Sequence, residues 1–320
     1  IPSPKPVSLG APVAKALLAD VDPETLGLLA PEQGGLGAAL WKESSRQLVD
    51  RLLPAVQLPT PSYSLNDVAK RMFLTTAAAP APSATGLAPK RTLMAQRIEG
   101  LMNLGAVGEA WNLFALADPT LIDPVTLTRL VEASVMGPEG QKVCDAVPSL
   151  MAAQSQQKEM QLDWQKTLLV CQLRGGDKKA AELSLDMMKE QGAKRDTFIQ
   201  LLERNVLGKK KRLPRHLTPL RPTVLALLRE SGKPLPSHLY KNPAAYLVPE
   251  LVKAKAQRPK ARVNLAERSA AKGILSKKEL AAVYQEAATG AKKNDKSKAV
   301  KRAKLYYGAV NEEQPHKKII

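Results

Sequence analysis

A chain of 320 residues with 44% hydrophobic residues can bury a substantial core, either in one elongated unit or in two compact ones. Aromatic residues make up only 4%, and the apolar residues are mostly Leu, Ala and Val, which favours helices over an aromatic-rich β-sandwich. The formal net charge of +18 predicts attraction to anionic surfaces, such as nucleic acid, phospholipid headgroups, an envelope polymer such as lipopolysaccharide, or acidic proteins, without selecting one. No stretch approaches the roughly 18 to 20 consecutive apolar residues that cross a bilayer, which argues against an integral membrane protein.

The beginning of the chain is rich in proline. It starts at Ile1 with IPSPKPVSLGAP, and a second segment rich in Pro, Ala and Ser, AAAPAPSATGLAPK, covers 77–90. Such segments have little apolar surface to bury and favour extended linkers. We therefore expect an extended Pro/Gly-rich segment over 1–36 and a flexible Ala/Pro linker over 79–90. Because the first residue is not Met, we also expect a processed or truncated product, and a removed signal peptide fits this beginning.

Two amphipathic helices are expected between these segments, over 37–78. The first falls in LGAALWKESSRQLVDRLLPAV and the second in SLNDVAKRMFLTTA, where apolar residues such as Met72 and Phe73 recur at helical spacing. Ser64, followed three residues later by Asp67, is a variant of the capping box and predicts the start of the second helix. We expect the two helices to pack as a pair.

A repeat begins near residue 91, in LMNLGAVGEAWNLFA, EASVMGPEGQKVCDA and VCQLRGGDKKAAELS. Each sequence joins two helical runs through a glycine-marked turn, at Gly105, Gly137 and Gly175, so the intervals are 32 and 38 residues. Helix-turn-helix units with periods of about 30 to 40 residues are typical of helical solenoids. We therefore predict an all-α fold, with a right-handed stack of antiparallel helical hairpins (an α-solenoid) over 91–208 behind the Pro-rich N-terminal extension.

The remainder of the chain is less regular. We expect an irregular helical continuation with a basic loop over 209–290, then a Lys-rich segment, a helix and a tail over 291–320. Local signals place several helix ends: Gly192 as a left-handed C-terminal cap, Asp196 and Ser276 as helix starts, and Pro222 in a first turn.

The hairpins resemble tetratricopeptide-type repeats. Trp164, the small pair Ala180 and Ala181 and the period are similar to that family, whereas the Gly and Tyr of its first helix are missing here. Three longer stretches, LWKESSRQLVDRLLP, WQKTLLVCQLRGGDKKAAELSLDMMKEQG and ARVNLAERSAAKGILSKKELAAVYQEA, resemble a group of exported all-helical alphaproteobacterial proteins of unknown activity. This second resemblance implies a helical fold and an envelope location, although the lysine runs at 209–212 and 292–304 are atypical of the group.

Cys144 and Cys171 are the only cysteines of the chain. They fall on the second helix of one predicted hairpin and the first helix of the next, and neighbouring helices of a solenoid lie side by side. A disulfide between them, in an oxidising compartment, and two buried thiols are equally compatible with this placement. Two cysteines without a nearby histidine do not make a four-ligand zinc site, so we expect no metal and no cofactor.

The sequence contains no convincing catalytic constellation. The histidines (His216, His238 and His316) have no nucleophile or carboxylate at a recognisable spacing, and there is no phosphate loop, HExxH or GxSxG motif. A glycosidase would need two helical carboxylates across one cleft, and candidates are Asp67, Glu99, Glu132, Asp163 and Glu203. We expect the chain not to be an enzyme, and a cell-wall-sugar enzyme is the least favoured hypothesis.

Two basic clusters are the candidate anion-binding residues. They consist of Lys209, Lys210, Lys211, Arg212 and Arg215, and of Lys292, Lys293, Lys296, Lys298, Lys301, Arg302 and Lys304. Neither cluster is interrupted by an aromatic residue, which favours diffuse attraction to phosphate or lipid over base readout, and solvated loops are the alternative. Trp111 and Trp164 are either core residues or, if exposed, anchors for a partner.

These observations favour a non-enzymatic helical-repeat scaffold or adaptor that binds a protein or peptide partner, because a solenoid presents a long curved surface with little chemistry of its own. We expect it in the periplasm or at a bacterial cell envelope. The alternative is a cytoplasmic, nucleic-acid-associated basic protein.

Overall fold

The computed structural model describes residues 22–82, 91–154, 158–205, 208, 217, 219–290, 295 and 297–311. Over these residues the chain is all-α, with 14 α-helices and no β-strand apart from three isolated bridges. The all-α class predicted from the sequence is confirmed.

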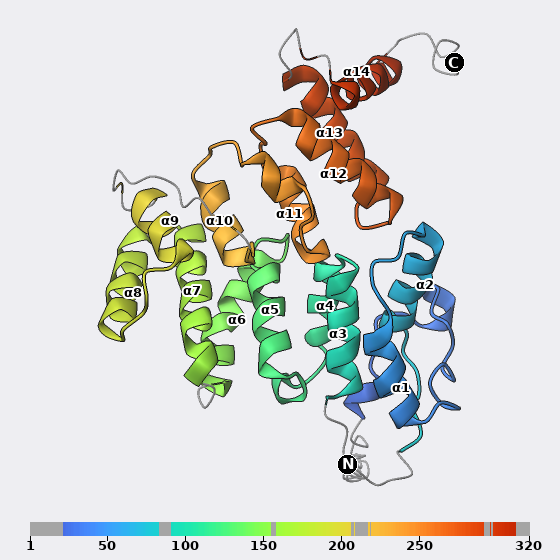
Figure 1. Ribbon diagram of the computed structural model, residues 1–320. Coiled ribbons are helices and arrows are strands. Elements are labelled where there is room, and N and C mark those ends of the chain that lie inside the picture. Colours follow the sequence, from blue (N-terminus) through green and yellow to red (C-terminus); the bar gives the residue numbers. More distant parts are fainter. Residues whose placement is uncertain are drawn as a thin grey trace, which may run out of the picture.

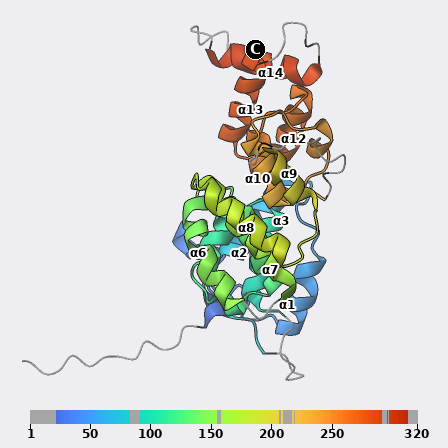
Figure 2. The ribbon, with the colours of Figure 1, turned by 90° about the vertical axis from the view of Figure 1, so that its left-hand side faces the viewer.

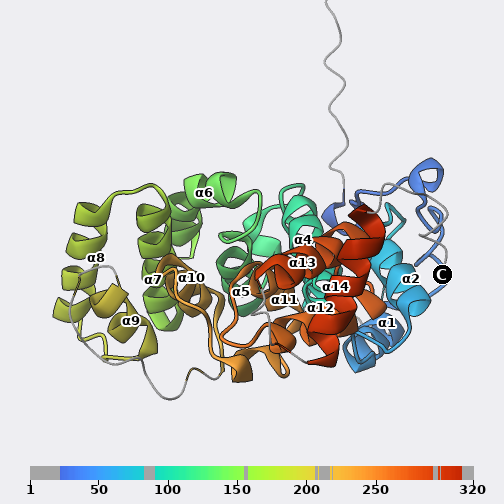
Figure 3. The same ribbon diagram turned by 90° about the horizontal axis from the view of Figure 1, so that it is seen from above.

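The helices form a row and a return path. The row runs through α1 (Arg46–Leu52), α2 (Tyr63–Leu74), α3 (Leu93–Asn103), α4 (Val107–Phe114), α5 (Pro124–Ser134), α6 (Gly140–Ala153), α7 (Lys158–Arg174), α8 (Lys178–Glu190) and α9 (Thr197–Asn205). The chain then returns across one edge of the row through α10 (Pro222–Glu230), α11 (Val248–Lys253), α12 (Pro259–Ala271), α13 (Lys277–Gly290) and α14 (Lys298–Asn311) (Figures 1 and 3). Seen from the side, α12 to α14 extend beyond the row (Figure 2).

A glycine lies in the turn after the first helix of each predicted hairpin. Gly105, between α3 and α4, has a φ of +76°, and its N–H donates to Met102 O while the next N–H donates to Leu101 O. This pair of bonds is the Schellman motif, which satisfies carbonyls at a helix end and requires a left-handed residue. The turns predicted at Gly105, Gly137 and Gly175 all lie between helices of the structure.

The turn between α7 and α8 differs from the prediction in one detail. Gly176, rather than Gly175, is the left-handed residue, with a φ of +79°. Its N–H donates to Leu173 O, and the Asp177 N–H donates to Gln172 O, so the motif is the same but shifted by one position. Gly137 does not adopt a positive φ, and its N–H donates to Ser134 O instead.

Most of the predicted helix ends are confirmed. Gly192 has a φ of +81°, Pro222 is the first residue of α10, and Asp196 Oδ1 accepts from the Ile199 N–H at the start of α9. Before α13, Ser276 Oγ accepts from the Glu279 N–H while the Glu279 carboxylate accepts from the Ser276 N–H, a reciprocal capping box.

Two predictions for the first helices are wrong. The N-cap of α2 is Ser62, whose hydroxyl accepts from the Leu65 N–H, so Ser64 lies inside the helix. The first helix is shorter than the apolar pattern suggested, because Ser45 caps α1 and residues 38–44 form turns and a bend. Trp41, in those turns, nonetheless joins Val49 of α1 in a small apolar cluster that α2 also contacts through Met72.

A larger apolar core runs through the rest of the described chain, from Phe73 of α2 to Ala303 of α14. Arg97 of α3 crosses this core and is completely buried. Its guanidinium donates to backbone carbonyls of Leu26, Phe73 and Thr75, so it fixes the segment before α1 and the end of α2 against α3.

Candidate binding cleft

A cleft of about 460 Å³ lies where the turns between helices meet the returning chain. Three glycine turns line it, at Gly105 between α3 and α4, at Gly137 between α5 and α6, and at Gly273 between α12 and α13. Residues from the start of α2 and from α11 complete its walls. The cleft is therefore built by both the row of helices and the returning C-terminal part.

Gly105 is required for this convergence. A β-carbon at position 105 would lie 2.6 Å from Ile274 Cγ2 and 3.1 Å from Ala245 O, and the positive φ would add backbone strain. The α3–α4 turn can thus approach the α12–α13 turn only because residue 105 has no side chain. A hydrogen bond from Asn66 Nδ2 to Lys272 O, 2.8 Å long, ties α2 to the same C-terminal turn.

Carboxylates outnumber cations on the walls of the cleft. The carboxylates are Glu109, Glu139, Glu250 and Glu279, and the cations are Lys70 and Lys253. Glu109 pairs with Lys70, whereas Glu250 pairs with Lys253 and also with Arg229 of α10. Glu139 pairs with Lys142 on the surface, and Glu279 serves as a cap.

Aromatic side chains supply much of the remaining wall. Tyr63, at the start of α2, is 57% exposed and lies against the Gly273 turn. Tyr246, which is half-buried, lies just before α11. Trp111 of α4 also lines the cleft and contacts Phe114, with ring centroids 5.3 Å apart. A chain with only three Trp, six Tyr and three Phe places three of these aromatic residues in one cleft.

An ion-pair cluster lies beyond Tyr246, in a smaller cavity of about 230 Å³. Arg221, at the start of α10, donates to both Glu132 of α5 and Asp163 of α7. Burial raises the pKa of Glu132 to about 7, because this carboxyl is only 2% exposed, although Arg221 opposes the shift. Burial also raises the pKa of Tyr246.

Glu132 and Asp163 are two of the five carboxylates considered as a catalytic pair. Arg221 forms an ion pair with each of them, and these contacts join α5, α7 and α10. This arrangement is typical of a structural ion-pair cluster. Of the other three, Glu99 binds Arg91 and Glu203 binds Arg195, while Asp67 is exposed on α2.

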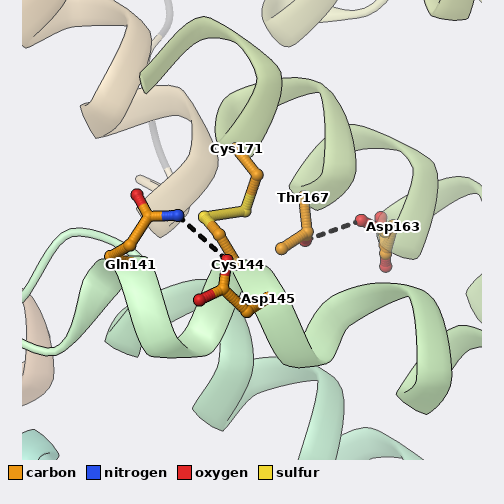
Figure 4. Close-up of a disulfide and its surroundings, with 6 residues drawn as sticks. All are labelled: Gln141, Cys144, Asp145, Asp163, Thr167 and Cys171. Atoms are coloured by element: carbon orange, nitrogen blue, oxygen red, sulfur yellow. Dashed lines mark hydrogen bonds between the residues drawn. A yellow bond between two sulfur atoms is a disulfide. The ribbon is translucent and has the colours of Figure 1, made fainter. Parts of the chain in front are cut away.

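Cys144 of α6 and Cys171 of α7 form a disulfide in the structure, with their Cα atoms 5.4 Å apart (Figure 4). The bridge joins neighbouring helices of successive hairpins. Neither cysteine is among the residues that line the cleft.

Both tryptophans singled out from the sequence are buried. Trp164 is 0% exposed and Trp111 is 7% exposed, so neither is a protruding anchor for a partner. Trp111 still reaches the wall of the cleft, whereas Trp164 packs in the core between the helices.

Most of the basic residues considered for anion binding lie outside the described residues. These are Lys209, Lys210, Lys211, Arg212, Arg215, Lys292, Lys293 and Lys296. The described members are on α14, where Lys298, Lys301 and Lys304 are exposed. Arg302 forms a bidentate ion pair with Glu267 of α12 and so has a structural partner.

Comparison with protein families, with curated proteins and with solved structures gives no match to this chain. Within the described ranges, no helix has the length and apolarity to cross a membrane. The same residues contain no group of three or more His, Cys, Asp or Glu side chains placed to hold a metal ion.

Proposed function

We propose that the protein is a non-enzymatic helical scaffold of the α-solenoid type, whose cleft binds a segment of a protein partner. Its repeats are the hairpins α3/α4, α5/α6 and α7/α8. The first helices of consecutive hairpins contact each other, α3 with α5 and α5 with α7, and the second helices α4 and α6 contact the first helix of the next hairpin, α5 and α7 respectively. This pattern of contacts supports the stacking expected of a tetratricopeptide-like repeat array.

The cleft between the glycine turns is the observation that carries this proposal. It is concave, it combines aromatic walls with charged groups, and it is formed by segments far apart in the sequence. Its charged side chains bind one another or cap a helix, which suits recognition better than acid–base chemistry. The inward carboxylates Glu132 and Asp163 are held by Arg221 instead of facing the cleft.

The disulfide supports a location in an oxidising compartment, because cytosolic thiols are generally kept reduced. We place the scaffold in the bacterial periplasm or at the cell envelope. The cytoplasm is the alternative, and the redox state of Cys144 and Cys171 in protein taken from the native host distinguishes the two.

A bulky residue at position 108 tests the proposal. Gly108 lies on the wall of the cleft, and a β-carbon there would have no described atom within 4 Å, so Gly108→Trp fills the cleft without a clash of its β-carbon. Gly308, in α14, is equally open and lies outside the cleft, which makes Gly308→Trp the matched control.

The two variants are compared by co-purification of the full chain from its native host after crosslinking. We expect a partner protein that the wild type and Gly308→Trp retain and that Gly108→Trp loses at least tenfold. Equal recovery by both variants would show that partners do not use the cleft.

Nucleic-acid association is the second candidate, favoured by one observation. Lys298, Lys301 and Lys304 are all exposed on α14 in a chain of net charge +18. Phosphate contacts by three lysines give binding that weakens steeply with salt. Substituting all three with Gln should weaken low-salt binding to duplex DNA or RNA and reduce its salt dependence, and unchanged binding would remove this candidate for α14.

A further inference from the structure

Two adjoining cavities lie along one side of α12. They have volumes of about 410 and 150 Å³, and both are lined by Lys241 and Arg268. No carboxylate of the described chain lines either cavity, whereas five Lys and Arg side chains do. These five cations, which define a basic groove, are Lys241, Arg258, Lys260, Arg268 and Lys272.

The groove cations have no acidic partner. None of the five forms an ion pair among the residues that the structure describes. Glu267 of α12 binds Arg302 of α14, and Arg262 of α12 binds Glu286 of α13. The ion pairs of α12 are thus made with α13 and α14, and its unpaired cations line the groove beside the short helix Ser237–Tyr240.

One carboxylate acts on the groove from outside. Asp295 interacts electrostatically with Lys260 and with Lys304 of α14, but it forms an ion pair with neither. Counted against the five cations, it leaves the groove a formal charge of +4. A concave surface lined by charges of one sign attracts ligands of the opposite sign.

The groove residues of α12 are regularly spaced. Lys260, Asn264, Arg268 and Lys272 recur every four residues and form one row along the helix. Because an α-helix rises about 1.5 Å per residue, neighbours in this row are about 6 Å apart along its axis. Side chains on one side of an extended peptide recur about every 6.6 Å. The row therefore matches an extended segment with acidic side chains at alternate positions.

Two side chains of the row are suited to specific contacts with a peptide. Arg268 Nη2 donates to Tyr240 O and Lys241 O at 3.3 and 3.1 Å, which positions the guanidinium. Its Nε and Nη1 groups have no partner in the described chain, and a positioned guanidinium binds a carboxylate through two parallel N–H donors. The side chain of Asn264 forms no hydrogen bond there either, and it offers a peptide backbone both a donor and an acceptor.

The groove offers little to nucleic-acid bases or to lipid tails. Its one tyrosine, Tyr240, is 1% exposed and donates its hydroxyl to Ala254 O, so His238 is the only ring on the walls that is open to stacking. The large hydrophobic side chains that are exposed in the described chain all lie outside the two cavities, so the groove has no apolar anchor for a bilayer.

We propose that the basic groove binds an extended, acidic polypeptide segment, whose Asp or Glu side chains at alternate positions pair with the cations of α12. The unopposed positive charge, the spacing of the row and the free amide of Asn264 favour this ligand over nucleic acid or lipid. The groove shares only Ile274 with the cleft between the glycine turns, so it is a second surface beyond the proposed scaffold function.

The test uses two rhodamine-labelled peptides, GETETETETG and its uncharged analogue GQTQTQTQTG, titrated with the full chain by anisotropy. About 0.15 M salt screens the diffuse attraction of a chain with net charge +18. We expect the acidic peptide to bind and the glutamine peptide to bind at least tenfold more weakly.

Matched double variants locate the site. Lys241→Gln/Lys260→Gln removes two exposed cations of the groove and should weaken the acidic peptide at least fivefold. Lys298→Gln/Lys301→Gln removes the same charge from exposed positions of α14 outside the groove and should weaken it less than twofold. Gly108→Trp, in the cleft, should leave peptide binding unchanged.

Several results would overturn the inference. Equal affinity for the two peptides, or no binding of either, would show that the groove does not recognise carboxylates. Equal losses by the two double variants would show diffuse attraction to the basic chain, and loss of the peptide by Gly108→Trp would place it in the cleft. A short DNA duplex and phosphatidylglycerol vesicles are titrated alongside. If either of them, and not the peptide, loses affinity for Lys241→Gln/Lys260→Gln, the groove binds phosphate instead of an acidic polypeptide.

Discussion

Phe73 of α2 lies directly against Gly100 of α3. A β-carbon at position 100 would fall 2.4 Å from the tip of the buried Phe73 ring, and three ring atoms lie within 3 Å of that position. Glycine at this position therefore sets how closely α2 and α3 approach.

We expect Gly100→Ala to destabilise the protein by roughly 1 to 3 kcal/mol, because an added methyl group in a packed core forces its neighbours to move. Gly308→Ala is the matched control, since Gly308 lies in α14 with open space around it. The helix propensity of alanine should make this second change neutral or stabilising by about 0.5 to 1 kcal/mol. Urea-unfolding midpoints measure both, and a neutral Gly100→Ala would contradict the close packing.

The buried guanidinium of Arg97 gives a second prediction. Its Nε donates to Phe73 O at 2.7 Å, and its two Nη groups donate to Leu26 O and Thr75 O. Arg97→Met should cost about 3 kcal/mol or more, because buried carbonyls that lose their donor each cost about 1 kcal/mol or more. Arg129→Met, which removes a half-exposed side chain with a 3.5 Å contact to Glu99, should cost less than about 1 kcal/mol. Similar losses for the two variants in urea unfolding would argue against the role of Arg97.

The disulfide gives a third prediction. Cys144 and Cys171 are 27 residues apart in the sequence, and closing a loop of this length stabilises a fold by about 3 to 4 kcal/mol in the chain-entropy estimate. A reductant should lower the unfolding midpoint of the wild type to that of Cys144→Ser/Cys171→Ser and should not change the double variant. If oxidised and reduced wild type unfold together, the bridge does not stabilise the protein.

Glu132 gives a prediction about pH. Burial raises its pKa in the folded state to about 7, above the ordinary value of 4.5, despite the nearby cations Arg221 and Lys166. A carboxyl shifted in this direction stabilises the fold below pH 4.5, and that contribution is lost as the pH rises through 7.

The wild type should therefore lose stability between pH 5 and pH 8 relative to Glu132→Gln, by on the order of 1 to 3 kcal/mol. Glutamine has the shape of the protonated carboxyl and cannot ionise. Urea unfolding of both proteins at the two pH values measures the difference. If the two proteins change in parallel, Glu132 does not titrate in this range.

The hairpins could be predicted from the sequence because their signals are local. Gly105 and Gly192 end their helices through hydrogen bonds within six residues, and the Ser276–Glu279 capping box spans four. The start of α2 was predicted wrongly because local signals can be ambiguous. Ser62 and Ser64 are both suitable N-caps, and only the backbone conformation distinguishes them.

The cleft could not be predicted because its walls meet only in three dimensions. Tyr63 and Gly273 touch across more than 200 residues of sequence, and Asn66 binds the carbonyl of Lys272 across a similar interval. One signal was present in the sequence: Gly105, Gly137 and Gly273 are each followed within six residues by a glutamate of the cleft wall. The burial of Trp111 and Trp164 likewise depends on neighbouring helices, which a single helical stripe does not specify.

A photocrosslinking amino acid at position 108 of the full chain tests whether partners bind in the cleft. The same amino acid at position 308 serves as the control. We expect irradiation in the native host to link a protein partner to position 108 and not to position 308. Crosslinks at position 308 alone, or at neither position, would show that partners do not bind in the cleft.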